Sequence, residues 1–148
     1  AEHHFSNYSL IPSPLMMVAH CAAVTTQIRL ATGIVIASIY QPARLLSEVA
    51  FVDAMTEGRL ILGVGSGYQP HELTRFQATI DESPDMTEEM LDILEGGLSQ
   101  DVFEYEGKHF SFPHTHMALS PMQTPHPPSS SPGPMSNWCA GQPARIAR

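Results

Sequence analysis

Two hydrophobic periodicities alternate along the chain. Over residues 14–26, apolar side chains recur at helical spacing, directly after a Ser13–Pro14 pair of the kind that begins helices. Residues 28–36 are rich in β-branched side chains and nearly continuously apolar at their end, which is typical of a strand buried on both faces. The first pair of elements is therefore a helix followed by a parallel strand.

The same order repeats further along the chain. A second apolar stripe at helical spacing begins at Pro42 and stops before Gly58, where a left-handed residue would end the helix. Residues 59–64 then form another short apolar run. Alternation of helices and strands through short connections is the pattern of parallel βαβ units with right-handed crossovers. The sequence therefore predicts the α/β fold class.

The following segment departs from the regular alternation of helices and strands. A flexible glycine-rich loop, residues 63–67, precedes a third helix that begins at Ser83, and the glycine pair at 96–97 is expected to end or weaken this helix. Two alternating runs, residues 102–105 and 109–112, predict a β-hairpin.

Prolines and serines dominate the end of the chain. Residues 129–148 show no apolar periodicity that could be buried, so this tail is expected to be disordered or unrelated to the preceding fold. Residues 1–128 then form one domain. The chain opens on Ala1 rather than methionine and leaves no room before it for the strand that a barrel or sheet would need, so we expect a truncated product.

Composition and charge narrow the classes of function. The 148 residues are 43% hydrophobic, and fifteen acids against seven scattered bases give a net charge of -8, which makes nucleic acid an unsuitable partner. No apolar run is long enough to span a bilayer, and the start lacks the pattern of a signal peptide, so we expect a cytoplasmic protein. Cys21 and Cys139 form no disulfide framework and no zinc spacing.

The segment Glu2-His3-His4 is the first candidate for chemistry, because two imidazoles that transfer protons near neutral pH precede a loop and a helix. The plainer interpretation is two surface histidines at a frayed terminus. A shared metal ion is disfavoured, since neighbouring residues of an extended chain point to opposite sides. The pair His114 and His116 is also assigned to a solvated loop, so we expect no metal site.

An ordered set of short motifs resembles the bacterial luciferase-like flavin monooxygenase family over residues 1–128. The motifs that carry this resemblance are Glu2-His3-His4-Phe5, Asn7-Tyr8, Pro12-Ser13-Pro14, Arg29-Leu30-Ala31-Thr32-Gly33, Gln41-Pro42, Asp53, Gly58-Arg59-Leu60, Gly63-Val64-Gly65, Glu104-Tyr105-Glu106-Gly107-Lys108-His109-Phe110 and Gln123-Thr124-Pro125-His126-Pro127-Pro128. The resemblance implies a partial (β/α)8 TIM barrel that covers the end of strand 2 to just before strand 5. Such barrels place the active site at the carboxyl ends of the strands.

The resemblance also assigns roles to individual residues. His3 would lie beside the flavin as the proton-transferring base, with Glu2 or His4 tuning it. A non-prolyl cis peptide bond at Gly33–Ile34 would support the isoalloxazine ring, although a bulge or a tight packing position explains Gly33 equally well.

The glycine-rich loop would hold the flavin phosphate. Gly65, Ser66, Gly67 and Tyr68 form this cofactor-binding segment, and Ser66 stands where relatives often have arginine. Phosphate binding would then depend on backbone amides and the serine hydroxyl. A dinucleotide-binding fingerprint is disfavoured, because the third glycine it needs is replaced by Tyr68.

The implied parent enzyme takes reduced FMN from a separate flavin reductase and uses O2 to oxidise a small organic substrate, as a homo- or heterodimer. A deazaflavin-dependent oxidoreductase of the same superfamily is the first alternative, and Ser66 keeps it open. A non-catalytic truncated fragment that associates through exposed strand edges is the second.

Overall fold

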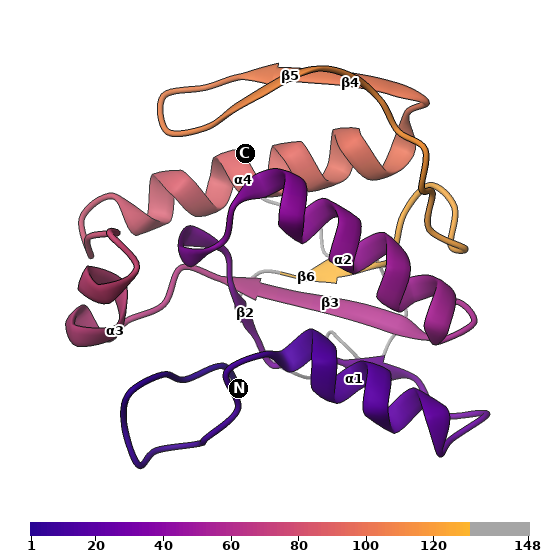
Figure 1. The fold of residues 1–148 in the computed structure, drawn as a ribbon, viewed down its shortest axis with the longest axis horizontal. Helices are drawn as coiled ribbons and strands as arrows, with labels where there is room; N and C mark the ends of the chain where they lie inside the picture. The colour runs from indigo at the N-terminus through magenta and orange to yellow at the C-terminus, as the bar shows by residue number, and fades with distance from the viewer. Residues whose placement is uncertain (131–148) are drawn as a thin grey trace.

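In a computed structural model, which describes residues 1–130, a parallel sheet lies beside a layer of helices, and an antiparallel hairpin covers the outermost helix (Figure 1). The central strand is β3 (Leu60–Gly65). Its first residues pair with β1 (Leu30–Ala31), its last with β2 (Val35–Ile36) and its middle with β6 (Ser129–Ser130), all in parallel. The α/β class predicted from the sequence is confirmed.

The single strand predicted over residues 28–36 is wrong, because the ladder is interrupted between β1 and β2. At the interruption the Thr32 hydroxyl takes over the missing main-chain bonds. It donates to the carbonyl oxygen of Gly63 at 2.9 Å and accepts the Gly63 amide at 2.8 Å. The peptide bond between Gly33 and Ile34 is cis, as the family resemblance implied.

Three helices form the layer beside the sheet. They are α1 (Pro14–Ala23), α2 (Pro42–Met55) and α4 (Ser83–Ser99), and α2 packs against both of the others. The Ser13 hydroxyl caps α1, and the Gln41 side-chain oxygen caps α2 by accepting the Arg44 amide at 2.8 Å. Helix α1 ends at Ala23 rather than at residue 26.

The core lies between these helices and β3. Its fully buried side chains are large aliphatic ones from α1, α2, α4 and the strands, among them Leu15, Leu45, Leu46, Val49, Leu60, Leu62, Met90 and Ile93. A short 3-10 turn, η1 (Ala37–Ile39), connects β2 to the segment before α2 and also contacts α4.

The glycine pair does not end the third predicted helix, since α4 continues to Ser99. A Cβ atom on Gly96 would overlap the Phe103 ring, and one on Gly97 would approach Leu46 to 2.9 Å. Glycine is needed here for close approach inside a regular helix. The short helix α3 (Pro70–Arg75) was not predicted.

The predicted hairpin is confirmed as β4 (Val102–Glu106) and β5 (Ser111–His116). His114 and His116 therefore lie in a strand and not in the loop that the sequence suggested. His114 faces Glu104 on the exposed hairpin, with Nδ1 and Oε2 at 3.4 Å.

Asp53 of α2 fixes the segment that leads to β6. Its buried carboxylate accepts the backbone amide of Gln123 at 2.9 Å and the Gln123 side-chain amide at 2.7 Å. The chain therefore reaches β3 again at Ser129 and Ser130, two residues beyond the predicted domain boundary.

The remainder of the predicted tail, with Cys139, lies outside the described residues. Cys21 is a free, partly buried thiol. None of the helices described here is long and apolar enough to cross a membrane.

Candidate functional site

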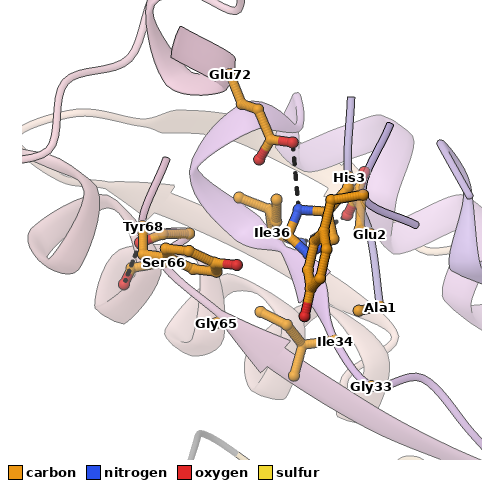
Figure 2. A pocket seen from close by; sticks show the side chains of 12 residues that line it. Ala1, Glu2, His3, Gly33, Ile34, Ile36, Gly65, Ser66, Tyr68 and Glu72 are labelled. Carbon is orange, nitrogen blue, oxygen red and sulfur yellow. Dashed lines mark hydrogen bonds and ion pairs between the residues drawn. The ribbon is translucent and has the colours of Figure 1, made fainter. Parts of the chain in front are cut away.

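The site begins with the extended segment at the start of the chain, which lies across the carboxyl ends of β2 and β3 (Figure 2). Glu2 and His3 are buried, with 2% and 6% of their surface exposed, and His4 is partly buried. The His3 amide donates to the Ile11 carbonyl oxygen at 3.3 Å, which closes the loop that precedes α1. These histidines are part of a packed structure and not of a frayed terminus.

Glu2 joins three parts of the fold. Its Oε2 accepts the backbone amide of Ile36 at 2.7 Å, and its Oε1 accepts the hydroxyl of Tyr40 at 2.9 Å and lies 3.0 Å from Nε2 of His4. Burial raises the pKa of the Glu2 carboxyl, and the bonds from Ile36, His4 and Tyr40 oppose that shift. Burial and then the negative charge of Glu2 raise the pKa of the Tyr40 hydroxyl.

The His3 ring has different partners from those the family resemblance suggested. Its Nδ1 lies 3.2 Å from Oε1 of Glu72 and 3.1 Å from Nε2 of Gln69. The same Glu72 oxygen accepts the backbone amide of His4 at 2.7 Å. Glu2 and His4 bond to each other rather than to the His3 ring.

A cavity of about 460 Å³ opens in front of His3 (Figure 2). Every residue assigned to cofactor binding from the sequence lines it, and so do Glu2 and His3, whereas His4 lies outside the lining. The lining residues are Ala1, Glu2, His3, Tyr8, Gly33, Ile34, Ile36, Gly65, Ser66, Gly67, Tyr68 and Glu72. The volume falls in the range of small-molecule sites, which is about 300–1,000 Å³.

The glycine-rich loop forms one wall of the cavity. Gly65 is the last residue of β3, so the loop itself is shorter than residues 63–67. The Ser38 hydroxyl donates to the Ser66 carbonyl oxygen at 3.0 Å, which anchors the loop to η1. Gly67 has a φ of +78°, and a Cβ atom there would lie 2.9 Å from Ile36. Only glycine fits this backbone without strain.

Two exposed tyrosines contact the His3 ring. The rings of Tyr8 and Tyr68 meet it edge-on, with centroids 5.0 Å and 5.9 Å from its own. Within residues 1–130, no three His, Cys, Asp or Glu side chains gather as metal ligands would. The arrangement suits proton transfer to an organic ligand in the cavity.

Sequence reasoning missed Glu72, Gln69 and Tyr40. The sequence offered one signal for the first of these. Gln69-Pro70 has the form of the Gln41-Pro42 pair that begins α2, and Pro70 is likewise the first residue of α3, although the Gln69 side chain makes no capping hydrogen bond. Because this helix follows the glycine-rich loop directly, its residue Glu72 lies in the lining of the cavity.

Parallel strands that alternate with helices and end at a shared cavity define an α/β protein with its ligand site at the carboxyl ends of the strands. Within that class, this chain belongs to the luciferase-like monooxygenase family, whose model matches residues 1–144. The match runs past residue 128, where the motifs quoted above end.

Two curated relatives illustrate the similarity. Protein y4vJ of Sinorhizobium fredii (strain NBRC 101917 / NGR234) is 53% identical over 128 residues, which are 86% of this chain and 36% of the relative. The oxygenase component of the flavin-dependent trigonelline monooxygenase of Acinetobacter baylyi is 33% identical over 129 residues, with the same two coverages. The chain thus spans about a third of the length of these relatives.

Solved structures show the same fold. The monooxygenase RslO1 from Streptomyces bottropensis matches with a TM-score of 0.84 and 30% identity, over 88% of this chain and 40% of that one. The oxygenating constituent of 3,6-diketocamphane monooxygenase from Pseudomonas putida, solved with FMN, matches with a TM-score of 0.79 and 25% identity, over 88% and 39%. An F420-dependent secondary alcohol dehydrogenase shares the fold at 18% identity, with a TM-score of 0.75 over 89% and 42%.

Proposed function

We propose that this chain carries part of the active site of a flavin-dependent monooxygenase, which uses reduced FMN and O2 to oxidise a small organic substrate. One observation carries the proposal. The segment Glu2-His3, the Gly33–Ile34 bond and the loop 65–68 are far apart in the sequence and converge on one cavity. A separate reductase would supply the reduced flavin, as the name "oxygenase component" of one relative indicates for that protein.

The residues present fit a flavin. Gly33, Ile34 and Ile36 give the cavity an apolar wall against which a flat ring could lie, and the space that a Cβ atom on Gly33 would occupy is open. Backbone amides of the loop and the Ser66 hydroxyl would hold the phosphate. Bound reduced flavin would supply the electrons that activate O2.

The protein's own contribution would be proton transfer and protection from water. His3 would accept or return a proton through the ring nitrogen that Glu72 does not contact. Tyr8 and Tyr68 would close the cavity around the ligand, which limits the access of water to the reactive group. Glu2 and His4 would hold the His3 segment in place through Ile36 and Tyr40.

We further propose that the chain supplies the barrel from the end of the second strand to the start of the fifth, slightly beyond the span predicted from the sequence, which stops just before the fifth. The interrupted strand β1–β2 would be the third barrel strand, β3 the fourth, and β6 the start of the fifth. The parent enzyme would act as a homo- or heterodimer.

A deazaflavin-dependent oxidoreductase is the second candidate, favoured by Ser66. Without arginine in the loop, the cavity offers no cation from this position to a flavin phosphate. The shared fold of the F420-dependent dehydrogenase is compatible with this candidate but shows the fold alone. A non-catalytic fragment is the third candidate, since the chain covers only about a third of its curated relatives.

Fluorescence titration separates these candidates. FMN and the deazaflavin F420 are each titrated into the chain, and quenching of FMN with a dissociation constant below about 1 mM is the expected result. Stronger binding of F420 would favour the second candidate, and binding of neither would favour the third.

A matched pair of glycine variants tests the position of the ligand. Gly67 and Gly58 both have positive φ, +78° and +74°, but Gly58 lies away from the cavity. Gly67→Ala should weaken FMN binding at least about tenfold, equal to about 1.4 kcal/mol, and Gly58→Ala should leave it unchanged. Equal effects of the two substitutions would contradict the proposed site.

A further inference from the structure

We propose that Glu72 is a positioning residue for His3, and that its carboxylate keeps the neutral imidazole protonated on Nδ1 so that Nε2 faces the cavity as a proton acceptor. This inference rests on the proposed role of His3 in proton transfer. It concerns the tautomer of the ring, which can be observed without any cofactor.

A single oxygen of Glu72 makes both of its contacts. Oε1 accepts the His4 backbone amide at 2.7 Å and lies 3.2 Å from Nδ1 of His3. Glu72 is 1% exposed, and the helix α3 holds it against the cavity. Because the His4 amide donates to this oxygen, the carboxylate cannot turn away from the His3 ring without also losing its bond to the His4 N–H group.

The carboxylate determines which tautomer fits. A carboxylate only accepts hydrogen bonds, so a ring nitrogen at hydrogen-bond distance from it must carry the hydrogen. Gln69 competes for the same nitrogen, since its Nε2 lies 3.1 Å from Nδ1 and as a donor would require the opposite tautomer. An amide can exchange its oxygen and nitrogen by rotation and accept from Nδ1 instead, whereas a carboxylate has no donor to offer.

The other ring nitrogen of His3 is available for chemistry. Nε2 has no hydrogen-bond partner within the described part of the chain, and it remains accessible to solvent. The ring lies in the lining of the cavity (Figure 2), and it also contacts the rings of Tyr8 and Tyr68. A proton acceptor at Nε2 therefore meets whatever binds there.

Glu2 provides a matched control. It is a buried carboxylate of the same site, but its oxygens contact His4, Ile36 and Tyr40 and none contacts the His3 ring. A change that merely disturbs packing near the cavity should affect the variants of Glu2 and Glu72 alike. An effect on the His3 tautomer should arise only at Glu72.

The test is heteronuclear NMR of the chain with isotope-labelled histidine, at a pH where the imidazoles are neutral. His3 is assigned by the loss of its signals in His3→Gln. The wild-type chain should show His3 predominantly as the Nδ1–H tautomer. Glu72→Gln should retain this form, since its one oxygen can still accept from both donors, while Glu72→Leu should shift the population several-fold toward Nε2–H.

The proposal is overturned by a wild-type ring that carries its proton on Nε2. It is also overturned if Glu72→Leu leaves the tautomer unchanged, or if Glu2→Leu shifts it as much. Should Glu72→Leu fail to fold, the wild-type and Glu72→Gln spectra still decide. Flavin titration on the same samples is a separate readout: absence of FMN binding with the expected tautomer would refute the proposed function and leave the Glu72–His3 contact established.

Discussion

The Oε2 atom of Glu2 lies 2.7 Å from the backbone nitrogen of Ile36, so the start of the chain is tied to the strand that follows the Gly33–Ile34 bond. This contact places His3 against the cavity, because Glu2 and His3 are neighbours. It also buries a carboxyl group, and burial raises the pKa of Glu2. The charged form of Glu2 therefore opposes folding.

The first prediction concerns the pH dependence that Glu2 imposes on stability. The folded chain binds this proton more tightly than the unfolded chain, so its stabilising effect is complete below pH 4.5 and is lost as the pH rises through the raised folded pKa. The free energy of unfolding of the wild type should therefore fall, relative to Glu2→Gln, as the pH rises above 4.5. Urea denaturation across this range measures the difference.

The exposed Glu88 of α4 provides the control for loss of one negative charge. The difference between wild type and Glu88→Gln is measured at the same pH values. A trend for Glu2→Gln no larger than that of the control would contradict the prediction.

The second prediction concerns Glu89 of α4. Its carboxylate accepts the backbone amides of Lys108, His109 and Phe110, at 2.9 to 3.1 Å, and so fastens the hairpin loop to α4. Glu89→Gln should destabilise the chain by about 1–2 kcal/mol. Hydrogen exchange of those three amides should be faster in the variant, and equal exchange in both proteins would refute the role.

The same carboxylate has a pH dependence of opposite sign to that of Glu2. Burial acts to raise the pKa of Glu89, but the three amide bonds together outweigh it and lower the pKa. The stabilisation is therefore present above pH 4.5, the value expected in the unfolded chain, and is lost as the pH falls through the lowered folded pKa. In the wild type only, the protection factors of the loop amides, which compare exchange with the intrinsic rate at each pH, should fall over that acidic range.

The third prediction concerns the glycine pair inside α4. Helix propensity alone would favour Gly96→Ala by about 1 kcal/mol, but the added Cβ atom would overlap the Phe103 ring. The substitution should instead destabilise the chain by about 1–3 kcal/mol. Thermal or urea unfolding measures it, and Phe103→Leu in the same chain should recover part of the loss. An increase in stability on Gly96→Ala would show that the ring can move aside.

The sequence predicted best where local chemistry and tertiary structure agree. Ser13-Pro14 begins α1 and the alternating runs after Gln100 form a hairpin, because caps, turns and periodicity act within a few residues. The prediction was wrong where a long-range contact decides the backbone. Strand 28–36 is broken at Thr32, whose hydroxyl pairs with Gly63, and α4 passes through Gly96 because Phe103 needs the space.

By itself, the amino-acid sequence determined the α/β class, the order of most elements and the family, since these depend on periodicity and on motifs read along the chain. Only the tertiary structure decided which side chains share the cavity. Glu72 meets His3 across 69 positions of sequence, and Glu2 meets Ile36 across 34. Such contacts cannot be predicted from sequence spacing. They depend on positions in space, which are set by the packing of the whole sheet and its helices.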